Sequence, residues 1–495
     1  MQESVISKGL SNGYPIPGAE RPSSIPLTRD WRGILEPLSC ERSFTPLEVN
    51  GNLPLEVSGT FLRNGPANTG HHGRTYAHWF DGDGAVTGVR FSHGKAYGAT
   101  QLVKTPEYIE EQQAGRCIYP GFGTLGKGFR KRTKLKNVAN TNLLHWQNRL
   151  FALWEGGLPT ELRMDDLDTV GRTNLDGVLS GAFSAHPHRV HSRKAIYNFG
   201  VNLGLRPSLD LYELPDHGPP KRLQRVRLSE NLMLHDFIVT EQFAVFLVSP
   251  VFLKTVPFLL GKGSFAANLS WTPQQGTEVI CIPLDEPEDV YRFYTEPFYQ
   301  WHFANAFDQN GHIHIDFVRF NTFQLVGWAD DLTSEGKGLA DFGELVRATV
   351  DPAKRTFHHR PLASTSCEFP TVAPWVTGRR HQFVYCCQHS KKAKAEGGLF
   401  DQIAKIDVMT SEIDSYTFDN GCVGSEPIFV PRANRPSAED DGYLMCLVYE
   451  PWSHTSHVLV FDAKQLHAGP MARVQFPEHI PYTFHGIWVP GNCDA

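Results

Sequence analysis

The chain has 495 residues, of which 41% are hydrophobic and 20% charged, and its formal net charge at pH 7 is -6. This composition is typical of a globular protein with enough apolar material for a large core. The acidic balance argues against a nucleic-acid partner, and no stretch reaches the ~18 apolar residues that a membrane-spanning helix needs. The N-terminus lacks the apolar core of a secretory signal, and the nine cysteines include no CxxC pair. We therefore expect a cytoplasmic protein with reduced thiols.

Short apolar runs bounded by Gly, Pro, Asn or Asp recur along the whole chain, and long helical periodicity is scarce. Runs of this length, rich in β-branched and aromatic residues, predict many short strands in a sandwich, a barrel or a propeller. In chain order, clear examples lie at 55–66, 149–157, 243–250, 443–451 and 457–463.

Four of the 22 histidines share a setting, because each lies beside apolar and aromatic residues where a strand-like run meets a loop. They are His186, His235, His302 and His485. Taken alone, each would be interpreted as a core histidine. The spacings of 49, 67 and 183 residues are too long for a local finger-type site, but they fit ligands that separate strands of a closed β body bring to one point. Four neutral imidazoles suit Fe, Cu, Ni or Zn better than Mg or Ca.

A second arrangement of histidines, in GHIHIDF, places His312 and His314 two residues apart and hence on one face of a strand. Such a pair could chelate a metal, but we interpret it as part of a solvent-facing stripe.

Three glutamates are candidates for orienting the histidine rings. Metal-bound imidazoles usually donate their other ring N–H to a carboxylate or carbonyl group. Glu155 in LWEGGLP, Glu368 in SCEFP and Glu426 in GSEPIFVP each lie beside a strand-like run in an apolar or turn setting. The alternative for each is an ordinary solvated charge.

Nine motifs in order give the chain a family resemblance. Each is weak alone, but their joint order from about residue 40 to the C-terminus resembles the carotenoid cleavage oxygenase family, in particular its bacterial apocarotenoid oxygenases. The motifs are FLRNGP (61–66), HWFDGDGAV (78–86), ANTNLL (139–144), ALWEGGLP (152–159), SAHPH (184–188), LHDFIVT (234–240), HFANAF (302–307), GSEP (424–427) and FHGIWVP (484–490).

The resemblance implies an all-β, seven-bladed β-propeller under a dome of loops and short helices. We expect an N-terminal extension at 1–35 and a single catalytic domain at 36–495. One non-haem Fe(II) per chain would be held by the four histidines named above, with Glu155, Glu368 and Glu426 orienting their rings. Thr141 would restrict one coordination position.

The implied function is a dioxygenase that cleaves a conjugated C=C bond of a carotenoid or apocarotenoid. O2 supplies both oxygen atoms of two carbonyl products, so no reducing cofactor is needed. The glycines of GFGTLGKG (121–128) lack the strand, helix and acidic partner of a dinucleotide site.

A polyene substrate requires an apolar tunnel, for which motif position indicates Trp154, Trp301, Phe303 and Phe320. We also expect peripheral contact with the inner membrane face through 248–265, whose apolar residues are flanked by lysines. The alternative for this segment is buried core. We expect a monomer.

Three other functions remain open. The first is cleavage of stilbenes or related phenolic alkenes by the same iron site. In that branch a Lys precedes the first glutamate, where this chain has Trp154, although Lys134 and Lys136 lie upstream. The second is a retinoid isomerohydrolase-like reaction, although the Pro-Asp-Pro-Cys-Lys motif of that branch is not found. The third is a non-enzymatic propeller scaffold, which would leave the histidines and glutamates unexplained.

Overall fold

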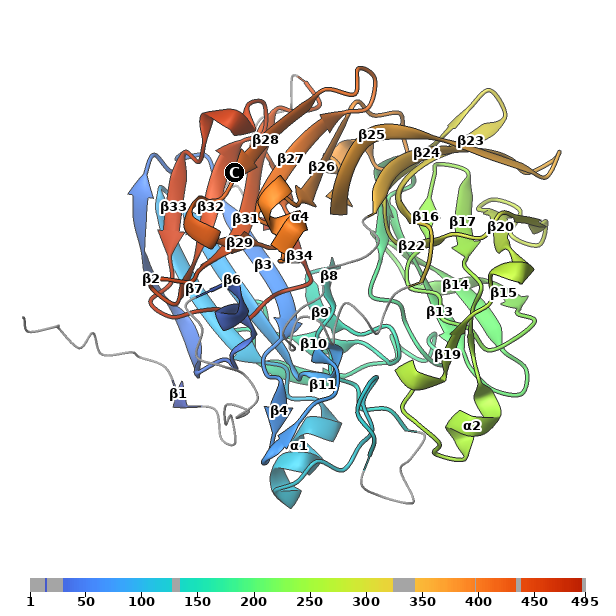
Figure 1. Cartoon of the computed structure of the whole chain (residues 1–495), viewed down its shortest axis with the longest axis horizontal. Coiled ribbons are helices and arrows are strands. Elements are labelled where there is room, and N and C mark those ends of the chain that lie inside the picture. The colour runs from blue at the N-terminus through green and yellow to red at the C-terminus, as the bar shows by residue number, and fades with distance from the viewer. Residues whose placement is uncertain are drawn as a thin grey trace, which may run out of the picture.

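Antiparallel strands follow one another around a central axis, from the N-terminal strands at the left of Figure 1 through the lower centre and the right to the C-terminal strands at the upper left. This computed structural model describes residues 14–15, 30–126, 134–323, 343–396, 398–432 and 438–491. Most of the expected extension at 1–35 lies outside these residues. The 3-10 helix η1 (Trp31–Leu35) already packs on the ring, where Ile34 and Leu35 are buried near Tyr449.

The sheet that closes the ring contains strands from both ends of the chain. Its N-terminal strands are β2 (Cys40–Gly51), β3 (Gly59–Pro66), β6 (Gly84–Ser92) and β7 (Lys95–Leu102), with β1 (Tyr14–Pro15) paired to β2. Its C-terminal strands are β29 (Val423–Gly424), β30 (Ile428–Pro431), β31 (Gly442–Glu450), β32 (Thr455–Asp462), β33 (Ala472–Gln475) and β34 (His485–Pro490).

Three four-stranded antiparallel sheets follow along the chain. The first contains β8 (Asn142–Trp146), β9 (Arg149–Leu153), β10 (Thr160–Leu162) and β11 (Thr169–Arg172). The second contains β12 (His188–Val190), β13 (Ala195–Asn202), β14 (Ser208–Pro215) and β15 (Lys221–Arg227). The third contains β16 (Ile238–Val239), β17 (Phe243–Val248), β20 (Thr277–Pro283) and β21 (Tyr291–Thr295).

A seven-stranded sheet and several short elements complete the described structure. The sheet contains β22 (Tyr299–Gln309), β23 (His312–Phe320), β24 (Glu344–Asp351), β25 (Thr356–Thr371), β26 (Phe383–Gln388), β27 (Gln402–Asp407) and β28 (Ile413–Thr417). Two hairpins pair β4 (Gly70–His71) with β5 (Arg74–Thr75) and β18 (Val251–Leu253) with β19 (Leu269–Trp271). The helices are α1 (Pro106–Ala114), α2 (Thr255–Leu259), α4 (Lys391–Glu396) and the 3-10 helices η2 (Trp79–Asp81), η4 (His191–Arg193), η5 (Ala266–Asn268), η6 (Pro273–Gln275), η7 (Pro374–Val376), η8 (Asp419–Gly421) and η9 (Leu466–Ala468).

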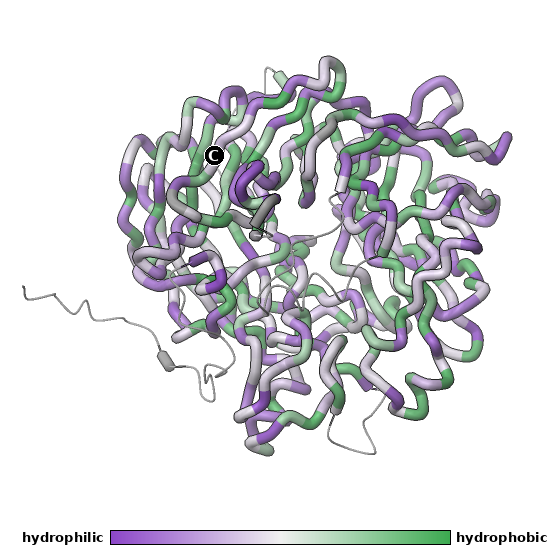
Figure 2. Tube along the Cα trace, in the orientation of Figure 1, coloured by the Kyte–Doolittle hydropathy of each residue, from purple (hydrophilic) through white to green (hydrophobic). Residues whose placement is uncertain are grey.

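Burial of apolar runs explains why these segments form strands. All eight residues of β3 are buried, as are eight of the nine in β31. Continuously buried runs of this kind are typical of strands that are covered by other parts of the protein on both faces. The hairpin tips carry the polar residues, and Figure 2 shows a hydrophilic tip between β24 and β25 at the upper right. The eight described cysteines are free and buried.

The ring closes through its first and last strands. β34 pairs with β3 in the register Phe61↔Trp488, and β2 pairs with both β7 and β33. The long β25 likewise joins two groups, since it pairs with β24 and then with β26. The predicted all-β ring is confirmed. Because two sheets run on beyond four strands, the predicted number of seven blades is not confirmed by the sheet pattern.

Candidate metal centre

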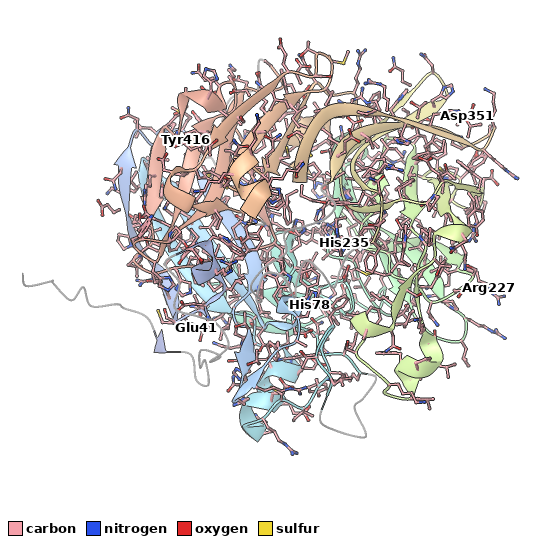
Figure 3. The ribbon with its side chains drawn as sticks, in the orientation of Figure 1. Glu41, His78, Arg227, His235, Asp351 and Tyr416 are labelled. Carbon is pink, nitrogen blue, oxygen red and sulfur yellow. The ribbon has the colours of Figure 1, made fainter. Side chains whose placement is uncertain are left out.

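Four histidines from four different sheets meet at the centre of the ring. His186 and His235 lie just before β12 and β16, His302 is in β22, and His485 begins β34. One ligand atom from each lies within 4.8 Å of the corresponding atoms of the others. Figure 3 shows His235 near the middle of the molecule, with Arg227 and Asp351 at its periphery. The sequence prediction that these residues converge is thus reproduced by the geometry.

The convergence leaves imidazole nitrogens without a conventional partner. Nε2 of His186 is buried and has no hydrogen-bond partner, and Nε2 of His235 lies 3.3 Å from Nε2 of His302. Buried polar atoms are rarely left in this state unless something else satisfies them. Four inward nitrogens from neutral imidazoles are a donor set that fits a divalent Fe, Cu, Ni or Zn ion. Within the described ranges, no other group of three or more His, Cys, Asp or Glu side chains brings its ligand atoms close enough together to hold a metal ion.

Each of three histidines is oriented by one of the expected glutamates. His235 Nδ1 donates to Glu155 Oε2 at 2.8 Å. His302 Nδ1 donates to Glu368 Oε2 at 2.5 Å, and His485 Nδ1 donates to Glu426 Oε1 at 2.9 Å. Because an ionised carboxylate only accepts, these bonds fix the tautomer and leave each Nε2 free to face the centre.

The fourth ligand, His186, is held differently. Its Nδ1 is 4.0 Å from Asp236 Oδ1, which is beyond hydrogen-bond distance. Asp236 instead accepts from His188 Nε2 at 3.1 Å and from the backbone N–H groups of Phe237 and Phe303. Asp236, which follows His235 directly, therefore links the segment that contains His186 and His188 to β22, which carries His302.

Burial and the neighbouring carboxylates set the protonation of the ligands. Burial, with the neighbouring histidines, lowers the pKa of His186 well below its usual value, and burial also lowers the pKa of His485. Burial acts to lower the pKa of His302 too, but the adjacent Glu368, together with the charges of Asp236 and Glu426, outweighs burial and raises that pKa. Neutral imidazole is the form that binds a metal, so burial prepares His186 and His485 for this role.

A cavity opens beside three of the four histidines and is lined mainly by aromatic side chains. Its empty volume is about 1150 Å³, including space that opens to solvent. Thr141, Trp154, Trp301 and Phe320 line it as expected, beside His235, His302 and His485. The hydroxyl of Thr141 donates to Asn140 Oδ1 at 3.2 Å.

Phe303 does not line this cavity, and the expectation that it belongs to the tunnel is corrected here. Its side chain is 4% exposed and packs in a core cluster with Phe317, 5.8 Å away between ring centroids. The register of β22 against β23 shifts between Gln300 and Phe303. A bulge of this kind interrupts the alternation of faces along a strand, so Phe303 turns toward the core after Trp301 has faced the cavity.

Sequence reasoning missed several residues around the site. Arg63 contacts Glu426 and is fully buried, and Asp236 and His389 were not singled out. The motifs contained Arg63, Asp236, Phe80 and Phe484, but motif membership does not tell a cavity wall from a core position. The missed aromatic side chains of the wall are Phe80, Phe122, Phe369, Phe400 and Phe484.

The fold and the site define a class: an all-β ring with a central four-histidine site that could hold a metal ion, next to an apolar cavity. The model of a family described as retinal pigment epithelial membrane protein matches residues 35–490. The chain is 34% identical to apocarotenoid-15,15'-oxygenase of Synechocystis sp., in an alignment that covers 94% of this chain and 98% of the relative. It is 29% identical to carotenoid 9,10(9',10')-cleavage dioxygenase 1 of Arabidopsis thaliana, with 90% and 86% covered.

Solved structures show the same likeness. Cobalt-substituted Synechocystis ACO superposes with a TM-score of 0.87 at 33% identity, covering 95% of this chain and all of that chain. An ACO/RPE65 chimera gives a TM-score of 0.87 at 32% identity, covering 94% and 99%. The chain therefore belongs to the retinal pigment epithelial membrane protein family, the family of the carotenoid cleavage oxygenases.

Proposed function

We propose that this protein is a non-haem Fe(II) dioxygenase that cleaves a conjugated C=C bond of an apocarotenoid or carotenoid with O2, giving two carbonyl products. The observation that carries the proposal is the convergence of four histidine ligands, three of them bonded to glutamates, at the base of an aromatic cavity. The named activities of the Synechocystis and Arabidopsis relatives support it.

The roles of the residues follow from their positions. His186, His235, His302 and His485 would hold the ion, which when bound supplies the site of O2 activation. Glu155, Glu368 and Glu426 orient the rings. The aromatic wall binds the polyene and excludes water, so the cleaved bond is selected by how the chain of the substrate fits the cavity. Thr141 lies at the cavity surface and narrows the space beside the ligands.

The side chain before the first glutamate favours a polyene over a hydroxystilbene. Trp154 lines the cavity there and offers an apolar wall and a π face, whereas a Lys would stabilise a phenolate. The two upstream lysines are engaged elsewhere: Lys136 pairs with Asp83 and Glu111, and Lys134 pairs with Glu107. Neither lysine is among the residues that line the described cavity.

The substrate class is tested by comparing kcat/KM of the iron-loaded protein for an apocarotenal and for a 4-hydroxystilbene. We expect the apocarotenal to be preferred. Preferred turnover of the hydroxystilbene would overturn the assignment of substrate while leaving the iron site intact.

We further propose that the protein contacts a membrane through part of 248–265. Val256, Leu259 and Leu260, on and just after α2, are 67%, 56% and 60% exposed, while Phe258 and Phe265 are buried behind them. The buried pair belongs to a cluster that also contains Phe122 and Trp301 of the cavity wall. An exposed apolar patch of this kind suits an apolar surface, and it lies next to the cavity that an apolar substrate must enter. No helix in the described ranges is long and apolar enough to span a bilayer.

The membrane proposal predicts a reduced affinity for liposomes when Leu259 and Leu260 are both replaced by Ser. Phe258 is unsuitable for this test because its ring packs against Phe265 at 5.6 Å. The matched control is Leu205→Ser, since Leu205 is 99% exposed on the hairpin between β13 and β14. Sedimentation with liposomes should show weaker binding for the double variant only. Equal binding by all three proteins would assign the patch no membrane role.

A further inference from the structure

One arginine of β3, Arg63, contacts the residues that hold the His485 ligand. Arg63 has no exposed side-chain surface. Its Nη1 donates to Glu426 Oε2 at 2.8 Å and to the Glu426 carbonyl at 3.1 Å. Its Nε donates to Thr483 Oγ1 at 3.0 Å, and its Nη2 donates to the carbonyl of Phe484 at 2.8 Å. The guanidinium thus holds both the glutamate that orients His485 and the two residues that precede this histidine.

Both carboxylate oxygens of Glu426 accept hydrogen bonds. Oε1 accepts from His485 Nδ1, while Oε2 accepts from Arg63 and from the backbone N–H of Gly486 at 3.0 Å. Gly486 leaves room for the arginine, because a Cβ there would lie 2.7 Å from Arg63 Cδ and 2.1 Å from the Leu62 carbonyl oxygen. The carboxylate is therefore fixed on both oxygens, and its orientation depends on the arginine.

Arg63 also lies where the two ends of the chain meet. It is opposite Gly486 in the pairing of β3 with β34, so one side chain bridges the strand closure and a metal ligand. Within the described residues, the recorded ion pairs of Glu155 and Glu368 are with their histidines, whereas Glu426 is also paired with this arginine. The His485 ligand thus has a support that the His235 and His302 ligands lack.

We propose that Arg63 is a positioning residue of the metal centre, which fixes the Glu426–His485 pair and so couples the closure of β3 on β34 to metal binding. The inference rests on the proposed function, since it requires that the four histidines bind Fe(II). The guanidinium fork matters as much as its charge, because it donates to a carboxylate and to carbonyl groups at the same time. A lysine at this position keeps the charge but cannot reproduce the planar set of donors.

The chain provides a matched control in Arg42. This buried arginine of β2 donates to both carboxylate oxygens of Glu478, at 2.8 and 2.6 Å, and likewise joins the N-terminal strands to the segment before β34. Within the described part of the chain, its side chain makes no hydrogen bond or ion pair with the four histidines or the three glutamates. Arg42→Lys should weaken the closure of the ring without changing the metal centre.

The test compares wild type, Arg63→Lys, Arg42→Lys and Thr483→Val as full-length chains. Thr483→Val removes the acceptor of Arg63 Nε and leaves the arginine in place. Three quantities are measured: the Kd for Fe(II) by competition with a chelator, the rise in Tm on adding Fe(II), and the visible spectrum of the Co(II)-loaded protein. Because a ligand that binds the folded state stabilises it by an amount that grows with the logarithm of its concentration divided by its Kd, the metal-induced rise in Tm separates the metal centre from general stability.

We expect Arg63→Lys to weaken Fe(II) binding by about 10-fold, at the lower end of the range for outer partners of a metal ligand. Its metal-induced rise in Tm should be smaller than that of wild type, and its Co(II) spectrum should change. Thr483→Val should give a smaller loss in the same direction. Arg42→Lys should lower Tm equally with and without metal and keep the wild-type Kd.

Three results would contradict the account, two of them the role of Arg63 and one the proposed function. A Kd and a Co(II) spectrum unchanged in both Arg63→Lys and Thr483→Val would overturn the role of Arg63 alone. A loss of Fe(II) affinity in Arg42→Lys equal to that in Arg63→Lys would also overturn it, because the effect would then be general destabilisation. Failure of the wild-type protein to bind Fe(II) would overturn the proposed function itself.

Discussion

Replacing His235 by Ala is expected to remove most of the bound iron and nearly all activity. The change removes one of four inward nitrogens and leaves Glu155, whose Oε2 accepts from His235 Nδ1, without its partner. Trp301, whose ring is 4.8 Å from the His235 ring, cannot replace the lost imidazole, because its indole N–H has no lone pair to offer a metal. Iron content after loading with Fe(II) and turnover of an apocarotenal measure the two effects.

The matched control is His312→Ala. His312 lies on β23 in the H-x-H pair with His314, and its side chain is 39% exposed, 3.7 Å from Asp351. This variant should keep wild-type iron content. A His235→Ala protein that kept full iron occupancy would contradict the assignment of the four ligands.

The second large effect is expected for Glu368→Gln. The carboxylate of Glu368 accepts from His302 Nδ1 at 2.5 Å and from the backbone N–H of Phe369 at 2.6 Å. Both N–H groups donate to the same carboxylate oxygen, Oε2. Glutamine has nearly the same size, but its uncharged amide oxygen accepts weaker hydrogen bonds than a carboxylate oxygen does. Loss of such a partner typically costs 10–100-fold in metal affinity or activity. The Kd for Fe(II) and kcat/KM should both change in this range, while the fold is retained.

Glu161→Gln serves as its control, because Glu161 pairs with Arg149 in the sheet of β8–β11 and not with a histidine. We expect no change in iron affinity for this variant. Unchanged iron affinity in Glu368→Gln, and equally in Glu155→Gln and Glu426→Gln, would show that the glutamates do not orient the ligands.

The sequence was informative where one local pattern repeated at distant positions. The four histidines share a strand-end setting, and the structure brings them to one point, although nothing local in the chain specifies that meeting. The three glutamates were recognisable because each stands in an apolar or turn context beside a strand, and all three contact histidine rings of the site. The many short apolar runs likewise predicted an all-β protein, and the structure has this architecture.

Other features depend on geometry that the residue pattern does not encode. The bulge in β22 turns Phe303 into the core, and the motif HFANAF contains no Gly or Pro that would predict this bulge. The segment 248–265 contains both buried and exposed apolar side chains, because Phe258 and Phe265 are core while Leu259 and Leu260 are exposed; its contact with a membrane stays a prediction. The role of Arg63 could not be predicted from its motif FLRNGP, because its partners Glu426 and Thr483 lie more than 360 residues away in the chain.

The central claim is O2-dependent cleavage of a polyene, and mass analysis of the carbonyl products tests it most directly. The iron-loaded protein is incubated with an apocarotenal under air, and the same mixture under argon and the His235→Ala variant serve as controls. The account predicts two carbonyl fragments in equal amounts whose masses sum to that of the substrate plus one O2, formed only by the iron-loaded wild type under air. A single product of unchanged carbon skeleton, or equal cleavage without O2 or by the variant, would contradict it.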